Sequence, residues 1–194
     1  MKKSFTLIEL IVVIAIIAIL AAIIAPNAFK AIDKAKVSAS LAYAKNIKTA
    51  ILSLYSDTGH FSGWVAGMTA GQYNYVKLDD DYNPSWQPSN LLSDESGWTG
   101  WDGPYMEQLT GRHRWGGTIM LLYYPIPASW ANGLGLYRWF PCYGNSANNC
   151  GVSETNLKKI DATVDDGVPT TGNHRVYYDA TYSQWYSLET LINF

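Results

Sequence analysis

The sequence FTLIELIVVIAIIAILAAIIA, residues 5–25, decides how the rest of the chain is organised. Its only charged residue is Glu9, close to its start, and it lies between Met-Lys-Lys-Ser and Pro26. At about 1.5 Å of rise per residue, a helix of this length spans a hydrocarbon core of ~30 Å. The two leading lysines predict that its N-terminal end stays in the cytoplasm.

The residue pattern of this stretch allows three interpretations. A secretory signal peptide could end at Ala25 or Ala28, but signal peptides normally have a shorter apolar core of about 7–15 residues. A simple membrane anchor fits the length, yet it leaves Glu9 in lipid at a cost of roughly 2.5–3.5 kcal/mol. In the third interpretation, which the pattern favours, the helix leaves the bilayer and packs among copies of itself. Glu9 then meets a positive partner.

The helical pattern continues through residues 26–56 as an amphipathic segment. Apolar residues recur there at steps of three and four, as a 3.6-residue period requires: Val37, Leu41, Ala44, Ile47, Ile51 and Leu54. Gly59 provides a stop signal, so we expect one helix from about Phe5 to Ser56. Pro26 removes a backbone hydrogen bond and predicts a kink or a locally melted turn. The alternative is that a membrane helix ends at this proline.

Residues 57–194 are long enough to form one head domain with its own core. Residues 1–56 carry seven lysines against two acids, whereas the head carries seven basic and fourteen acidic residues, a charge of −7. Such an acidic head disfavours nucleic acid as a partner.

Strand-like runs in the head are rich in β-branched and aromatic residues, and they lie at 118–125, 134–140, 176–179 and 185–188. Ser153 is a predicted N-cap for a short helix from Glu154 to about Val164. We therefore expect an α+β fold, in which a long N-terminal helix packs on an antiparallel sheet of roughly four strands.

Residues 60–117 are rich in Gly, Trp, Tyr, Asn, Asp, Ser and Pro and show little periodicity. We expect a long connection here, with a short helix around Tyr105–Leu109. In GWTGWDGPY, residues 97–105, the glycines permit tight turns and the rings can cover the exposed end of the long helix. The chain has eight Trp and fourteen Tyr. Packing and subunit contacts are the favoured explanation for these rings, and glycan binding or surface adhesion is the alternative.

The two cysteines of the chain, Cys142 and Cys150, both lie beyond the apolar segment. A close pair in an extracytoplasmic chain predicts a disulfide, and two unpaired thiols are the alternative. The loop-entropy relation gives roughly 2–3 kcal/mol for closing a ring of this size.

No residue pattern in the chain predicts catalysis. The three histidines show no metal-ligand spacing, and there is no G-x-S-x-G elbow and no P-loop, so we do not expect an enzyme. Two acidic groups could bind Ca²⁺ through several oxygen ligands: Asp79-Asp80-Asp81, and Asp161 with Asp165 and Asp166. For the second group a turn held by an ion pair with Arg175 is the favoured alternative, so no cofactor is expected.

The run KSFTLIEL, residues 3–10, followed by IVVIAIIAILAAIIAP, resembles the N-terminus of type IV pilins and type II secretion pseudopilins. The resemblance covers about the first 55 residues. It implies that residues 1–4 are a leader removed by a prepilin peptidase between Ser4 and Phe5. It further implies that Phe5 is N-methylated and that Glu9 neutralises the amino terminus of a neighbouring subunit. Ser4 stands where the family usually has Gly, and both residues are small.

The resemblance implies a structural subunit of a type IV pilus-like filament, held in the inner membrane before assembly and exposed on the cell surface afterwards. Its partners would be copies of itself, the prepilin peptidase and the inner-membrane assembly platform. One alternative is a periplasmic pseudopilin of a type II secretion system, whose heads resemble residues 97–105. Others are a minor pilin or adhesin and, less favoured, a secreted binding or hydrolytic domain cleaved near Ala25.

Overall fold

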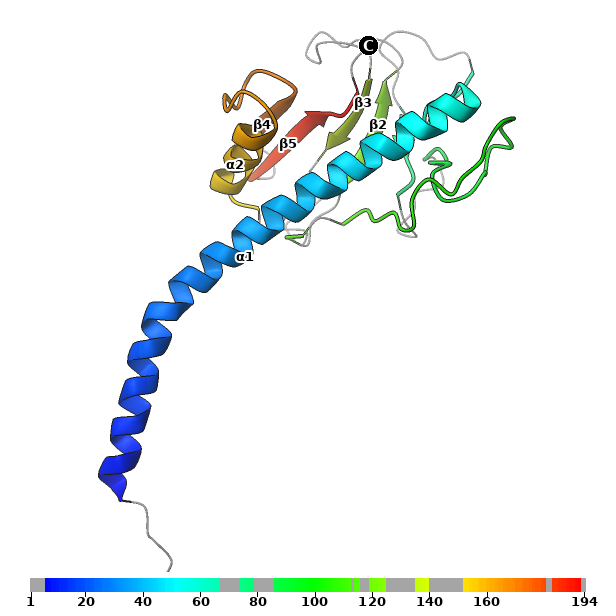
Figure 1. The fold of residues 1–194 in the computed structure, drawn as a ribbon. Helices are drawn as coiled ribbons and strands as arrows, with labels where there is room; N and C mark the ends of the chain where they lie inside the picture. The colour runs from blue at the N-terminus through cyan, green and yellow to red at the C-terminus, as the bar shows by residue number, and fades with distance from the viewer. Residues whose placement is uncertain are drawn as a thin grey trace, which may run out of the picture. The chain divides into compact units, whose positions relative to one another are not determined.

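The computed structural model describes residues 6–66, 74–78, 86–112, 114–115, 119–124, 135–139, 152–180 and 183–192. The chain divides into two compact units, Met1–Lys36 and Val37–Phe194. One helix, α1 (Leu7–Thr58), begins in the first unit and ends in the second (Figure 1). Its described bounds lie two residues further along the chain, at each end, than the sequence predicts.

The second half of α1 buries the apolar stripe that its sequence predicts. The side chains of Ile47, Ile51 and Leu54 are fully buried, and burial of each contributes about 1.5–3 kcal/mol. Ser40 and Ala50 are also buried on this face. The helix ends at Thr58. The next residue, Gly59, has a φ of +73°, which is accessible to glycine, and its amide donates to the carbonyl of Tyr55 at 2.8 Å.

Within the described residues, five strands form one sheet in the order β1-β2-β3-β5-β4, and all neighbours are antiparallel. Their bounds are β1 Asn74–Val76, β2 Met120–Tyr124, β3 Gly135–Trp139, β4 His174–Asp179 and β5 Gln184–Thr190. All four predicted strands are therefore present, and β1 is an additional one. The α+β fold expected from the sequence is confirmed.

The short helix α2 (Glu154–Val164) begins where the sequence predicts. The side chain of Ser153 accepts a hydrogen bond from the amide of Asn156 at 3.3 Å and so caps the helix. This helix lies against β4 and β5 (Figure 1).

The core lies between the second half of α1 and the sheet. A larger cluster joins α1 to β1 and β2 through residues such as Ile51, Val76 and Leu121. A smaller cluster joins Val37 of α1 to Ile160 of α2. Apolar burial of this kind supplies most of the driving force for folding such a head.

Residues 97–105 cover the C-terminal end of α1, as the sequence predicts. The hydroxyl of Tyr105 donates to a carboxylate oxygen of Asp57 at 2.9 Å, and Gly100 lies against the backbone oxygen of Asp57. The indole nitrogen of Trp101 donates to the carbonyl of Asn90 at 2.8 Å. These contacts tie the long connection to the last turn of the helix.

The prediction of a short helix at Tyr105–Leu109 is wrong, because this segment has no helical turn. The amides of Tyr105 and Met106 instead donate to the carbonyl of Leu91, at 2.8 and 3.3 Å. These tertiary hydrogen bonds hold the first two residues of the segment in a non-helical conformation.

Candidate functional site

The first half of α1 exposes its apolar side chains all round. The large apolar residues between Leu7 and Ile24 are 48–76% exposed. The helix is long and apolar enough to cross a membrane, and the mean hydropathy of its most apolar window is 3.3. A surface of this size and composition requires either lipid or other apolar helices around it.

Glu9 lies in the first turn of this helix and forms a reciprocal cap with Thr6. The amide and the hydroxyl of Thr6 both donate to Oε2 of Glu9 at 2.8 Å. In return, the amide of Glu9 donates to the hydroxyl oxygen of Thr6 at 3.3 Å. This is a capping box, in which two otherwise unpaired helix donors are satisfied by side chains.

Because of this cap, Glu9 has hydrogen-bond partners even before subunits meet. Within one chain its carboxylate already accepts two hydrogen bonds, and it lies at the positive end of the helix dipole. Among the described residues, both of these bonds end on Oε2, which leaves Oε1 for a second donor. Thr6 is a site residue that the sequence reasoning missed, although Thr6-Leu7-Ile8-Glu9 carries the capping-box signature.

Of the other site residues that the sequence predicts, the structure describes Pro26 but not the cleavage position or the two cysteines. Pro26 lies inside α1, and the residues around it are helical, so no melted turn is present there. A kink at this proline stays a prediction. Ser4 and Phe5 at the predicted cleavage position, and Cys142 and Cys150 of the predicted disulfide, lie outside the described residues.

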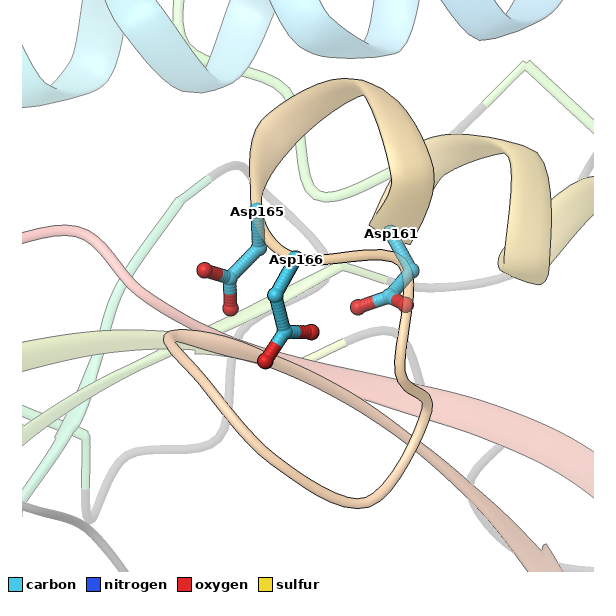
Figure 2. Close-up of side chains that lie close together, drawn as sticks. All are labelled: Asp161, Asp165 and Asp166. Atoms are coloured by element: carbon cyan, nitrogen blue, oxygen red, sulfur yellow. The ribbon is translucent and has the colours of Figure 1, made fainter.

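A second group of polar residues lies in the turn between α2 and β4. Figure 2 shows the carboxylates of Asp161, Asp165 and Asp166 close together at the end of α2. One oxygen from each lies within 4.8 Å of the others. The other acidic group considered in the sequence, Asp79 to Asp81, lies outside the described residues.

The carboxylates of Asp165 and Asp166 organise this turn. Oδ2 of Asp165 accepts hydrogen bonds from the amides of Asn173 and His174, the latter at 3.0 Å. Asp166 accepts from the hydroxyl of Thr171 at 2.7 Å and from the amide of Val168 at 2.8 Å. These two bonds hold the pKa of Asp166 below its usual range.

The ion pair between this turn and Arg175 that the sequence favours stays a prediction. Nε of Arg175 donates to the carbonyl of Gly172 at 3.2 Å. Gly172 has a φ of +70°, and a Cβ at this position would overlap the carboxylate of Asp165. The turn thus needs glycine both for its backbone conformation and for the close approach of the acid.

Asp161 differs from the other two acids because it is fully buried. Its Oδ1 lies 3.3 Å from Nδ1 of His174, which is also fully buried. Burial raises the pKa of Asp161, and the charges of Asp166 and Asp165 raise it further. The pair links the end of α2 to the start of β4.

The chain thus has an apolar N-terminal helix with a capped acid that continues into an α+β head, as the resemblance to pilins implies. Two family models match the sequence: the prokaryotic N-terminal methylation motif over residues 1–25, and the C-terminal region of PilW over residues 31–123. The predicted resemblance to the type IV pilin and pseudopilin family is thereby confirmed.

No curated protein sequence matches the chain. Among solved structures, the chain is similar to the major type IV pilin PilA1 from Clostridium difficile. The two are 19% identical, the similarity covers 84% of this chain and 98% of that chain, and the TM-score is 0.45.

Proposed function

We propose that this protein is a structural subunit of a type IV pilus-like filament. The observation that carries the proposal is the first half of α1, which exposes apolar side chains on every face and holds a single acid, Glu9, in its first turn. The match of residues 1–25 to the N-terminal methylation motif supports it. We likewise propose that the head has a structural rather than a catalytic role.

The proposed assembly begins with the chain in the inner membrane, where lipid surrounds the apolar half of α1. A prepilin peptidase removes residues 1–4, and the new amino group of Phe5 is methylated. The inner-membrane assembly platform then transfers the helix into a bundle of identical helices, where packing contacts replace lipid contacts. The finished filament lies outside the cell.

The Thr6–Glu9 cap gives Glu9 a defined role in this transfer. Because Oε2 is occupied by Thr6 within the chain, Oε1 is the oxygen that can accept the amino terminus of a neighbour. A carboxylate paired in this way is tolerated inside the bundle, whereas an unpaired one is penalised. The charge pair therefore selects the correct register between subunits.

The experiment that tests this role compares Glu9→Ala with Glu9→Gln. Glutamine retains an oxygen that can accept from Thr6, since capping boxes use Glu or Gln, but it has no charge for the neighbouring amine. We expect both variants to insert into the membrane and neither to form normal filaments, as seen by electron microscopy of sheared material. Asp33→Asn, which neutralises another acid of α1, should assemble normally. Abundant filaments from Glu9→Gln would show that the charge is not required.

N-terminal analysis of the mature protein tests the processing step separately. We expect the mature chain to begin at Phe5 and to carry the mass of one added methyl group. A start at Pro26 or beyond would instead identify a secreted domain with a cleaved signal peptide, and a start at Met1 would identify an unprocessed anchor.

A minor subunit is the second candidate role, and the match of residues 31–123 to PilW favours it. The two roles differ in abundance: a major subunit forms the bulk of sheared filaments, whereas a minor one is a small fraction beside another pilin. Quantitative mass spectrometry of purified filaments distinguishes them. Absence of the chain from surface filaments, with retention in the periplasm, would support a pseudopilin of a secretion system.

A further inference from the structure

A stripe of exposed residues runs along the second half of α1, beside its buried face. Lys45, Lys48, Leu52 and Tyr55 recur at steps of three and four, so they lie on one side of the helix and are called the lysine stripe below. All four are exposed, and Leu52 is 41% exposed although it is apolar. Among the described residues, neither lysine forms an ion pair. The stripe therefore presents positive charge and apolar surface that the described part of the chain does not cover.

The connection that covers the end of α1 carries the opposite charge. Residues 92–102, called the acidic segment below, contain Asp94, Glu95 and Asp102, which are all exposed, and no Lys or Arg. The segment begins with Leu92, an apolar side chain that is 40% exposed. It therefore offers the same combination as the lysine stripe, an exposed leucine beside charges, but the charges are negative.

The position of the acidic segment is electrostatically unfavourable within one chain. Gly100 packs against the backbone oxygen of Asp57 in the last turn of α1. The C-terminal end of a helix carries a partial negative charge, and this last turn contains no basic residue. Lys77 lies 3.5 Å from Glu95, but among the described residues no cation pairs with Asp57 or with the other two acids of the segment. Positive charge from outside the chain would stabilise this region.

The two surfaces lie at different levels of the same helix. At 1.5 Å of rise per residue, Asp57 lies about 14 Å beyond Lys48 and about 18 Å beyond Lys45, which is further than a lysine side chain reaches. A parallel copy displaced by this distance along the helix axis has its acidic segment level with the lysines of the first copy. The same displacement repeats from copy to copy. Such a head-to-tail contact does not close on itself and generates a filament.

We propose that the lysine stripe of one subunit docks on the acidic segment of a second copy of this chain. Lysines and carboxylates of opposite charge then face each other, and Leu52 and Leu92 lie within the contact. This inference rests on the proposed function, because parallel and axially displaced copies are those of a pilus-like filament. Complementary charges fix the register and exclude wrong partners. A lipid headgroup would neutralise the lysines alone, whereas a second copy neutralises the acids as well.

Zero-length cross-linking of filaments made of the natural chain tests the contact directly. A carbodiimide joins a lysine amine to a carboxylate only where the two groups touch. In filaments sheared from cells, we expect covalent dimers, and peptide mass spectrometry should show Lys45 or Lys48 linked to an acid of residues 92–102. The monomeric chain in detergent, treated in the same way, should not form this link. Filaments that lack the link would overturn the proposal.

Charge reversal tests whether the contact is needed for assembly. Lys45→Glu combined with Lys48→Glu should lower the yield of sheared filaments by about tenfold or more, because like charges then face each other across the interface. Adding Glu95→Lys and Asp102→Lys to the same chain restores opposite charges. We expect this fourfold variant to recover a yield within about threefold of the natural chain.

The matched control is Lys158→Glu combined with Lys159→Glu, which makes the same change of charge at exposed positions of α2 and should assemble as the natural chain does. An equal loss of filaments in the control would assign the effect to net charge and overturn the docking. Failure of the compensating changes to restore filaments would overturn it too, since lysines that bind lipid headgroups would give that result. Normal filaments from the variant with both lysines of the stripe reversed would overturn the docking and leave the proposed function intact. Absence of filaments from the natural chain would overturn both.

Discussion

The hydroxyl group of Tyr43 bonds to both backbone polar groups of Thr110. It donates to the carbonyl oxygen of Thr110 at 2.7 Å and accepts from the amide of the same residue at 2.9 Å. Tyr43 lies on α1, and Thr110 lies in the long connection 67 residues further along the chain. One side chain thus ties that connection to the helix and satisfies two partly buried backbone groups.

Tyr43→Phe should lower the free energy of unfolding by about 1–3 kcal/mol, because the amide and carbonyl of Thr110 both lose their partner while they remain partly buried. Denaturant unfolding of the full-length chain in detergent measures this change. Tyr178→Phe is the matched control, since Tyr178 is 52% exposed, and we expect a change within about 0.5 kcal/mol for it. Equal effects of the two substitutions would contradict a tie between Tyr43 and Thr110.

Two glycines of the segment 97–105 provide a test of its packing on the end of α1. Gly97 and Gly100 both have positive φ, +65° and +92°. A Cβ on Gly97 would have no neighbour within 4 Å, whereas a Cβ on Gly100 would overlap the backbone oxygen of Asp57. Alanine at Gly97 should therefore cost only backbone strain, roughly 1–2 kcal/mol. Alanine at Gly100 should cost about 1–3 kcal/mol more, because the helix end must move.

Denaturant midpoints of the two alanine variants measure the difference. A circular dichroism spectrum of each folded variant serves as the control that α1 is retained. If Gly97→Ala proved as costly as Gly100→Ala, the contact between Gly100 and Asp57 would not be a determinant of the head's stability.

The cap at the start of α1 predicts a local effect of substitutions at Thr6. Thr6→Val keeps the shape of the side chain but removes the hydroxyl that bonds to Glu9, which should weaken the first turn by about 1 kcal/mol. Exchange of the Glu9 amide with deuterium should then be roughly fivefold faster in detergent, since 1.4 kcal/mol corresponds to a factor of ten. Thr6→Ser should exchange as the natural chain does. Thr49→Val, on the same helix, should leave this amide unaffected.

The helix and most of the sheet could be predicted because their signals are local. The stripe from Val37 to Leu54 repeats with the helical period, and Gly59 follows it where a left-handed residue is needed. Ser153 likewise stands directly before the helix that it caps. Each of these signals is complete within a few residues of the element that it specifies.

The contacts that could not be predicted join residues far apart in the sequence. Strand β1 has three residues, too few for a periodic pattern, and it exists through pairing with β2, in which Tyr75 lies opposite Leu122. Asp161 meets His174 only because the intervening turn folds around two other carboxylates. The pattern at Tyr105–Leu109 suggested a helix, but hydrogen bonds to Leu91 decide its conformation. Local preference yields to tertiary contacts in such cases.

The phenol of Tyr123 predicts a loss of stability at alkaline pH. Tyr123 lies on β2 and is 7% exposed; burial raises the pKa of its hydroxyl, and the nearby Tyr55 raises it further. Above about pH 10 an unfolded tyrosine ionises, whereas the folded one keeps its proton. The unfolded state then binds fewer protons than the folded state, so the free energy of unfolding falls as the pH rises.

Tyr123→Phe removes this contribution and should make the decline above about pH 10 shallower, by up to roughly 1.4 kcal/mol per pH unit. Denaturant unfolding at a series of pH values measures the slope for the natural chain and for the variant. Tyr178→Phe, at an exposed position, should leave the slope unchanged and so controls for the loss of a tyrosine as such. Parallel declines for the natural chain and Tyr123→Phe would mean that other groups cause the alkaline loss, because the phenol of Tyr123 would then titrate alike in both states.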